Sequence, residues 1–215
     1  MKLQYLVHEA ATTLRALFSA ASRRARQKQF IHKMDIMGGE RIIDLGGTPH
    51  FWRNFPHKVH VTVVNLPGSF DPSQADGLDN VVCLAGNACN MSNFEDKSFD
   101  ICFSNSVIEH VGGPPNERAF AGEARRLSER YWVQTPSIWF PVEAHTYVPF
   151  WWFLPAPVKR FLRNRWSRIL PEWNEMIEGT TVILYKDFAR MFPDAEIWTE
   201  RFLLLPKSYV AFRKQ

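Results

Sequence analysis

Short apolar runs along the chain end at glycine, proline or asparagine and alternate with segments of helical periodicity. The runs are rich in β-branched residues or alternate apolar with polar positions, which predicts strands. We expect strands at residues 41–45, 59–66, 81–84 and 131–134, one more beginning at Ile101, and two between Glu196 and Lys214 joined at Pro206-Lys207. Helices are expected at residues 116–130, after a break at Pro114-Pro115, and at 157–170 and 186–191, and Pro49 suits the first turn of another.

The first residues of the chain show a separate helical pattern. Apolar residues recur at helical spacing from Leu3 to Ala21, with charged and polar residues on the remaining faces. A basic segment from Arg23 to Lys28 continues this amphipathic helix and is a solvated face, a cover over a ligand or a membrane contact. We expect residues 1–39 to form a helical cap and residues 40–215 the main domain.

Composition and charge narrow the class of protein. The 215 residues are 46% hydrophobic, enough for one domain with a substantial core. The net charge of +4 is a mild excess that does not demand nucleic acid as a partner. The three cysteines form no Cys-x-x-Cys pair, and no stretch reaches the roughly twenty apolar residues of a membrane-spanning helix. We therefore expect a cytoplasmic protein.

The stretch RIIDLGGTPHFW, which begins at Arg41, carries the first candidate chemistry. Asp44 lies near the end of an apolar run that stops at Gly46-Gly47, where the lack of a Cβ lets a ligand approach the backbone. Open α/β sheets bind ligands at the carboxyl ends of their strands. The adjacent glycines differ from the G-x-G-x-x-G pattern of dinucleotide-binding enzymes. A plain strand ending in a ligand-free turn is the alternative.

Later motifs carry a family resemblance. Gly86-Asn87-Ala88 and Ser98-Phe99-Asp100 precede the segment ICFSNSVIEHVG, which ends at Gly112. Together with the DLGG turn, these motifs resemble the class I S-adenosylmethionine-dependent methyltransferases, and in particular the type 11 and ubiquinone-biosynthesis-like groups. The resemblance implies an α/β three-layer, Rossmann-like sandwich with a mostly parallel seven-stranded sheet and an antiparallel carboxyl-terminal hairpin.

The resemblance also implies a binding site for S-adenosylmethionine across the ends of the first four strands. The residues that fall on the family's cofactor positions are Asp44, Gly46, Gly47, Thr48, Asn65, Leu66, Asn87, Ala88, Ser104, Asn105 and Ser106. Asn65 would hold the ribose and Asn87 would face the adenine. Both are amides where the family usually has an acid, so they can still hydrogen-bond but bring no charge.

Three residues are candidates for acid–base chemistry. The imidazole of His110, in the Glu-His-Val part of the motif, could take a proton from a substrate hydroxyl, or it could simply cap a helix. In the segment Phe-Pro-Val-Glu-Ala-His, the side chains of Glu143 and His145 would face the same side of an extended chain. They form a catalytic or a structural pair, and without a third ligand we expect no metal ion.

An aromatic and basic insert is expected at about residues 137–179. Its helix, 157–170, carries five cations beside Trp151, Trp152 and Phe153. Such a helix can lie on an anionic membrane, close over a lipid-linked or phosphorylated substrate, or simply cover the core as a solvated helix.

We therefore expect an S-adenosylmethionine-dependent methyltransferase, as the resemblance implies, acting on a hydroxyl of a small-molecule, glycan or lipid-linked acceptor. Two alternatives stay open. One is a non-catalytic binding or regulatory module, suggested by the altered glycine turn and the two amides. The other is a partner of membrane surfaces that uses the basic helix.

Overall fold

The computed structural model describes residues 22–69, 72–142, 148–169, 174 and 177–215. The chain divides after Met37 into two compact units, and each is described by itself. In the first unit, residues 22–34 form a helix, and the amide of Ile36 donates to the carbonyl of Ile31 (3.1 Å). The helix expected from Leu3 to Ala21 lies outside the described residues. The assignment of residues 1–39 as a cap stays a prediction.

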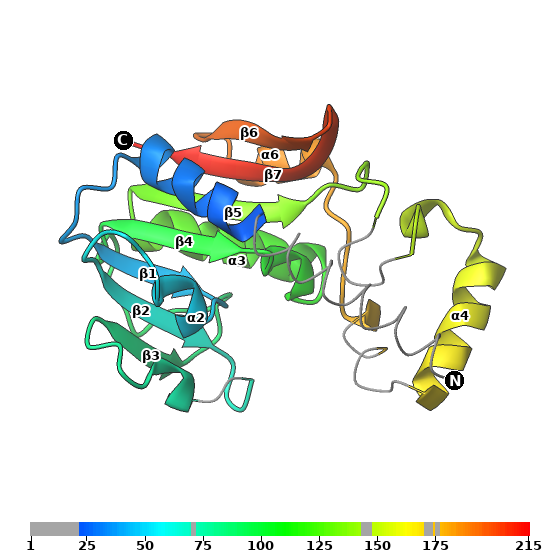
Figure 1. Cartoon of the computed structure of the whole chain (residues 1–215), viewed down its shortest axis with the longest axis horizontal. Coiled ribbons are helices and arrows are strands. Elements are labelled where there is room, and N and C mark those ends of the chain that lie inside the picture. Colours follow the sequence, from blue (N-terminus) through cyan, green and yellow to red (C-terminus); the bar gives the residue numbers. More distant parts are fainter. Residues whose placement is uncertain (1–21, 70–71, 143–147, 170–173, 175–176) are drawn as a thin grey trace, which may run out of the picture. The chain divides into compact units, whose positions relative to one another are not determined.

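The second unit contains one seven-stranded sheet in the order β3-β2-β1-β4-β5-β7-β6 (Figure 1). The strands are β1 Arg41–Leu45, β2 His60–Asn65, β3 Val81–Ala85, β4 Ile101–Asn105, β5 Arg130–Pro136, β6 Glu196–Phe202 and β7 Leu205–Arg213. The first five strands are mutually parallel, whereas β7 is antiparallel to both β5 and β6. The predicted mostly parallel sheet with an antiparallel carboxyl-terminal hairpin is confirmed.

Helices flank this sheet. The α-helices are α2 Pro49–Trp52, α3 Pro114–Leu127, α4 Ala156–Ile169 and α6 Tyr185–Met191, and the 3-10 turns are η1 Pro72–Ala75, η2 Ile108–His110 and η3 Trp151–Phe153. In Figure 1, α3 and α6 lie behind the sheet and α2 lies in front of it, which gives the layered arrangement. In the part of the chain that the structure describes, no helix has the length and apolar character needed to cross a membrane.

The core explains why β1 can present a polar residue. Ile43 and Leu45 are fully buried in a cluster with Phe120 of α3. Because side chains alternate along a strand, Asp44 faces the opposite side of the sheet, toward Trp52. The same strand therefore secures the core with one face and offers a carboxyl group on the other.

The predicted limits of α3 are wrong. Pro114 and Pro115 open the helix instead of breaking the chain, because the amide groups of the first helical turn need no partner within the helix. The helix stops at Leu127, and the hydroxyl of Ser128 then bonds to the carbonyl of Arg130 (2.8 Å), where β5 begins.

The predicted junction of the carboxyl-terminal hairpin is also wrong. The turn lies at Leu203-Leu204, and Pro206 is already part of β7. Both leucines have positive φ angles, +50° and +71°, which suits the twist of a tight hairpin but is unusual for residues with a Cβ. The sequence holds no glycine or asparagine there to signal the turn.

Candidate cofactor site

The site is built where the parallel strands end. Asp44 pairs in register with Val63 of β2 and Phe103 of β4, so the loops that follow these strands lie around its carboxyl group. The side chain of Asp44 is buried, and the indole Nε1 of Trp52 donates to its Oδ2 (2.7 Å). The other oxygen, Oδ1, is also buried and has no hydrogen-bond partner in the structure. A buried oxygen of this kind is a place for a positively charged or hydrogen-bonding ligand.

The environment of Asp44 sets its protonation. Burial disfavours the charged form and raises the pKa of the carboxyl group to about 7, although the hydrogen bond from Trp52 acts in the opposite direction. The rings of Phe51 and Trp52 pack against Phe103 (centroids 5.0 and 5.3 Å apart), which keeps this side of the strand apolar. A cation placed beside Oδ1 would reverse the effect of burial and favour the carboxylate.

The glycine turn leaves no room for side chains. Gly46 has φ +76°, and an added Cβ there would collide with the side chain of Val107. A Cβ on Gly47 would collide with the carboxyl group of Asp44 itself. The backbone of the turn therefore packs directly on the carboxyl group, which explains the adjacent glycines. The following α2 is only one turn long, and Thr48 before it is exposed and makes no side-chain cap.

Asn65 ties the second strand to this turn. Its Nδ2 donates to the carbonyl of Gly47 (2.8 Å), and its own backbone carbonyl accepts from the amide of Gly86 at the end of β3 (2.8 Å). An asparagine donates this bond, which an ionised aspartate could not do. Leu66, the next residue, is more than half exposed at the edge of the site.

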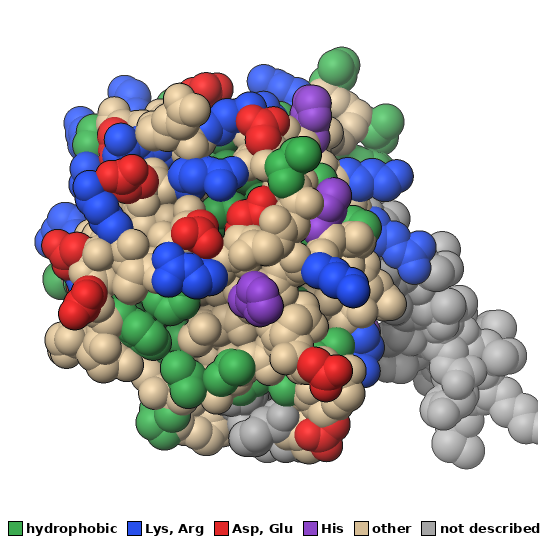
Figure 2. Space-filling model, turned by 90° about the vertical axis from the view of Figure 1, so that its left-hand side faces the viewer, with side chains coloured by type: hydrophobic (Ala, Val, Ile, Leu, Met, Phe, Trp, Pro, Cys, Tyr) green, Lys and Arg blue, Asp and Glu red, His purple; other side chains and the backbone are tan. Residues whose placement is uncertain are grey.

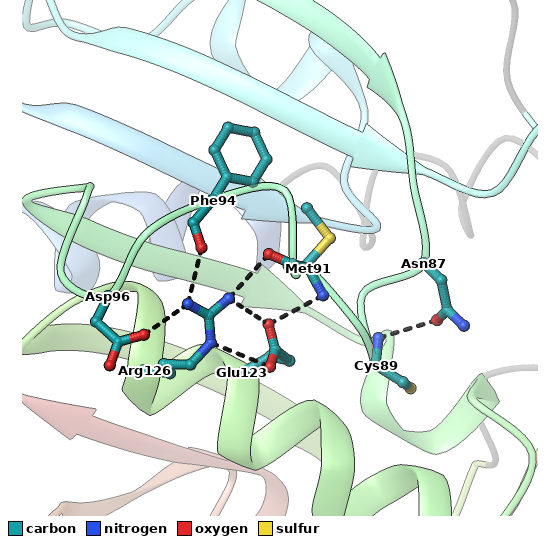
Figure 3. Close-up of polar contacts among 7 residues, drawn as sticks. All are labelled: Asn87, Cys89, Met91, Phe94, Asp96, Glu123 and Arg126. Carbon is teal, nitrogen blue, oxygen red and sulfur yellow. Dashed lines mark hydrogen bonds and ion pairs between the residues drawn. The ribbon is translucent and has the colours of Figure 1, made fainter.

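The loop that carries Asn87 is held from behind by α3 (Figure 3). Arg126 donates to the carbonyls of Met91 and Phe94 (both 2.8 Å), while Glu123 accepts from the amide of Met91 (3.0 Å). Asn87 itself is exposed, and its Oδ1 accepts from the amide of Cys89 (2.9 Å).

Arg126 and Glu123 both turn toward this loop. Arg126 also pairs with Glu123 (2.8 Å), so its guanidinium joins α3 to the loop through several bonds at once. Ala88, in the same loop, packs against the core cluster.

The segment after β4 uses its hydroxyl groups internally. Ser104 is fully buried and its Oγ donates to the carbonyl of Leu45 (2.9 Å), which joins the ends of β4 and β1. Ser106 has φ +57°, and its Oγ donates to Oε1 of Gln134 on β5 (2.8 Å). Asn105 lies between them and is half-buried. These residues thus line the strand ends, and whether they contact a cofactor stays a prediction.

Glu109 and His110 form a polar cluster that extends to residues distant in the sequence. The carboxyl group of Glu109 is buried and accepts from Oγ1 of Thr135 at the end of β5 (3.2 Å). Nδ1 of His110 lies 3.1 Å from Oγ1 of Thr180. Thr181 donates its amide to the Glu109 carbonyl (2.7 Å), which fixes the 3-10 turn that carries both side chains.

Two predicted residues are not described by the structure, and some observed contacts had no signal in the sequence. Glu143 and His145 lie outside the described residues. Glu117 is buried and accepts from Oγ1 of Thr181 (2.8 Å). The partners Trp52, for Asp44, and Thr180, for His110, were missed because no local pattern links them.

Residues 48–130 match the family model described as a methyltransferase domain. The matched segment contains the loops after β2, β3 and β4, on the sheet order given above. This segment of the chain therefore resembles a methyltransferase domain.

Parts of the chain are similar to named methyltransferases. A 94-residue stretch is 30% identical to phosphoethanolamine N-methyltransferase 1 of Arabidopsis thaliana, and it covers 41% of this chain but only 19% of that protein. The structure of Haemonchus contortus phosphoethanolamine N-methyltransferase 2, in complex with phosphomonomethylethanolamine and S-adenosylhomocysteine, has a TM-score of 0.55 at 13% identity, covering 81% of this chain and 38% of that one.

Structural likeness alone does not define chemistry at these identities. A Rhodobacter sphaeroides structure described as a zinc-dependent alcohol dehydrogenase has a TM-score of 0.61 at 11% identity, covering 86% of this chain and 87% of that one. These structures share the fold, and one scaffold hosts many reactions. The chemistry of this chain therefore depends on the residues of its own site.

Replacing Arg126 with glutamine should loosen the loop that carries Asn87. The variant loses charge-assisted bonds to two carbonyls and to Glu123, so we expect the free energy of unfolding to fall by about 2 to 3 kcal/mol in urea. Arg190→Gln is the matched control, because Arg190 forms a similar helical pair with Asp187 that is largely exposed. The control should lose less than about 0.5 kcal/mol. Equal losses in both variants would contradict the role of Arg126.

Asp44→Asn should stabilise the protein in a pH-dependent way. The pKa of Asp44 is raised from 3.8 to about 7 in the folded state, so the folded protein keeps a proton that the unfolded chain loses between these values. The stability of the unmodified protein therefore falls as the pH rises through this window. At about pH 8 the variant should be more stable by about 2 to 4 kcal/mol in urea unfolding.

That gain should shrink toward zero near pH 4, where Asp44 is protonated in both states. Asp79→Asn, at an exposed position, is the control and should show no such pH dependence. A gain for Asp44→Asn that is constant with pH would show that the carboxyl group is not buried as described.

Proposed function

We propose that the domain binds S-adenosylmethionine and transfers its methyl group to a small-molecule or lipid-linked acceptor. The observation that carries this proposal is the buried Oδ1 of Asp44, which has no hydrogen-bond partner in the structure and lies beside the Gly46-Gly47 turn. The methyl donor carries an ammonium and a sulfonium group, and a carboxylate in an apolar surrounding attracts such a cation strongly. The family match and the S-adenosylhomocysteine bound to the Haemonchus relative support the same cofactor.

The remaining strand ends offer contacts for the rest of the cofactor. Asn65 uses its Nδ2 on Gly47, which leaves its amide oxygen to accept a hydrogen bond from a ribose hydroxyl. Leu66 provides an exposed apolar surface beside it, and the Asn87–Ala88 loop lies at the end of the next strand for the adenine. This placement follows the family pattern with two amides in place of acids.

The chemistry that we propose is an in-line displacement. The bound methyl donor would supply a methyl group for attack by an acceptor oxygen, and the neutral thioether would leave with the electron pair of the broken carbon–sulfur bond. Since the leaving group is good, positioning supplies much of the rate. We propose that Nε2 of His110 takes the acceptor's proton, because Thr180 beside Nδ1 and the bonds around Glu109 fix the orientation of the ring. The names of the N-methyltransferase relatives favour a nitrogen acceptor as the second candidate.

Calorimetry with S-adenosylmethionine and S-adenosylhomocysteine tests the cofactor proposal. Asp44→Asn should weaken binding by about 10- to 100-fold, because it removes the charged partner of the cofactor's cation. Binding to the unmodified protein should weaken by up to about tenfold per pH unit below pH 7, as Asp44 becomes protonated. Asp79→Asn should behave like the unmodified protein. The absence of binding to both ligands would favour the non-catalytic module.

Turnover assays test the base. Release of S-adenosylhomocysteine should first be screened with phosphoethanolamine and hydroxyl-bearing analogues as acceptors. His110→Gln should then lower kcat by about 10²- to 10⁴-fold with unchanged cofactor affinity. Thr180→Val should give a smaller loss, since it removes only the group that orients the ring. Full turnover in a His110→Ala/His145→Ala variant would remove both histidines from the mechanism.

A further inference from the structure

Several bulky apolar side chains are exposed at the carboxyl edge of the sheet. They are Trp139, Phe150, Phe153, Phe202, Leu203 and Leu204, and we call this set the apolar rim. Leu203 and Leu204, at the tip of the β6–β7 hairpin, are 78% and 89% exposed. Trp139, Phe150 and Phe153 belong to the segment after β5, which we call the aromatic loop, and each is more than half exposed. Exposed apolar residues on this scale indicate an interaction surface.

The two parts of the rim are joined. The amide of Ser137 donates to the carbonyl of Lys207 (3.0 Å), which anchors the loop after β5 to the start of β7. The ring of Phe140 packs on that of Phe202 (centroids 6.3 Å apart), and the ring of Trp139 packs on that of Phe153 (5.5 Å). The apolar surface is therefore continuous from the hairpin tip to the aromatic loop.

The backbone at these tips is strained. Phe150, Leu203 and Leu204 all have positive φ angles, which costs a residue with a Cβ about 1 kcal/mol or more. Asparagine and glycine are the usual residues of such a hairpin turn. The chain thus holds large apolar side chains at positions where both backbone conformation and exposure oppose them, so folding stability does not account for them.

The neighbouring helix α4 supplies positive charge. It has no buried residue, and Trp166 on it packs against Trp151 of the aromatic loop (centroids 5.4 Å apart). Its charged residues are Lys159, Arg160, Arg163, Arg165 and Arg168, without a single acid. None of the five forms an ion pair with another residue that the structure describes. On the same helix, Val158, Phe161 and Ile169 are exposed.

The opposite edge of the sheet is different. Basic and acidic side chains are interspersed over the face where the strands begin (Figure 2). Arg41 pairs there with Asp100 (3.3 Å), and Arg213 pairs with Asp194 (2.9 Å). The opposite edge thus carries charges of both signs, whereas α4 carries basic residues alone beside the protruding apolar tips.

We propose that the apolar rim and α4 dock the protein on an anionic lipid bilayer. Leucine tips and aromatic rings would enter the boundary between headgroups and acyl chains, and the α4 cations would contact the lipid phosphates. A bilayer fits these protruding tips, whereas a protein partner would have to offer a pocket for each. The rim lies at the edge where β5 ends, because Pro136 pairs with Ser208 near the start of β7. If the proposed function holds, the docked site faces the lipid headgroups.

Sedimentation with vesicles tests the docking without any cofactor, so it can fail separately from the proposed function. The full chain should bind phosphatidylcholine vesicles that contain phosphatidylglycerol, bind pure phosphatidylcholine vesicles weakly, and dissociate at high salt. Leu203→Asn/Leu204→Gly should lower the vesicle partition coefficient by about tenfold or more. Because asparagine and glycine suit the turn, this variant should keep or raise the thermal midpoint, and its cofactor binding should not change.

The charges are tested separately. Arg165→Gln/Arg168→Gln should lower binding to the anionic vesicles by about 10- to 30-fold. The control Lys58→Gln/Lys214→Gln removes the same charge from the opposite edge and should have little effect. No sedimentation with anionic vesicles, or unchanged sedimentation of the Leu203→Asn/Leu204→Gly variant, would overturn the proposal. A dimer in gel filtration that this variant dissolves, without vesicle binding, would instead assign the rim to a second copy of the chain.

Discussion

The buried carboxyl group of Asp44 is the constraint on which the arrangement of the site depends. Its strand must be buried on both faces, so the carboxyl group lies among aromatic rings and keeps a pKa near 7. The turn after the strand must then lack side chains, because any Cβ on Gly47 would meet the carboxyl group. Trp52 satisfies one oxygen, and the other, which has no hydrogen-bond partner, would face the cation of the proposed cofactor. The buried negative charge of Asp44 lowers the stability of the folded protein, whereas the same charge would strengthen binding of the proposed cofactor.

The rest of the site is held by contacts that do not touch the proposed ligand. Arg126 and Glu123 fix the loop after β3 from the back of the sheet, and Asn65 fixes the glycine turn from the side. Asn65 also shows why an amide can replace an acid here. It donates to a backbone carbonyl, so it gives up the negative charge and gains a bond that stiffens the turn. A site that is already rigid loses less entropy when a ligand binds.

Much of the fold was predictable because its signals are local. Five parallel strands follow apolar runs with clear ends, and the two glycines mark the turn at Gly46-Gly47. The steric reason for these glycines, contact with Val107 and Asp44, appears only in the structure. The contacts that complete the site are not local. Thr180 reaches His110 across 70 residues, and no periodicity links them. The hairpin turn was predicted at Pro206-Lys207 instead of Leu203-Leu204 for a related reason. The leucines that form it carry no turn signal in the sequence.

That missing signal is itself informative. A sequence that agrees with its fold at every level would place asparagine and glycine in the tight turn and polar residues on the exposed tips. Leu203 and Leu204 break both rules, and they do so at the edge of the sheet where the proposed cofactor would bind. Departures from local consistency are expected where function requires them. Since the same edge also carries α4 with its unpaired cations, one surface could bring the site and an anionic lipid layer together.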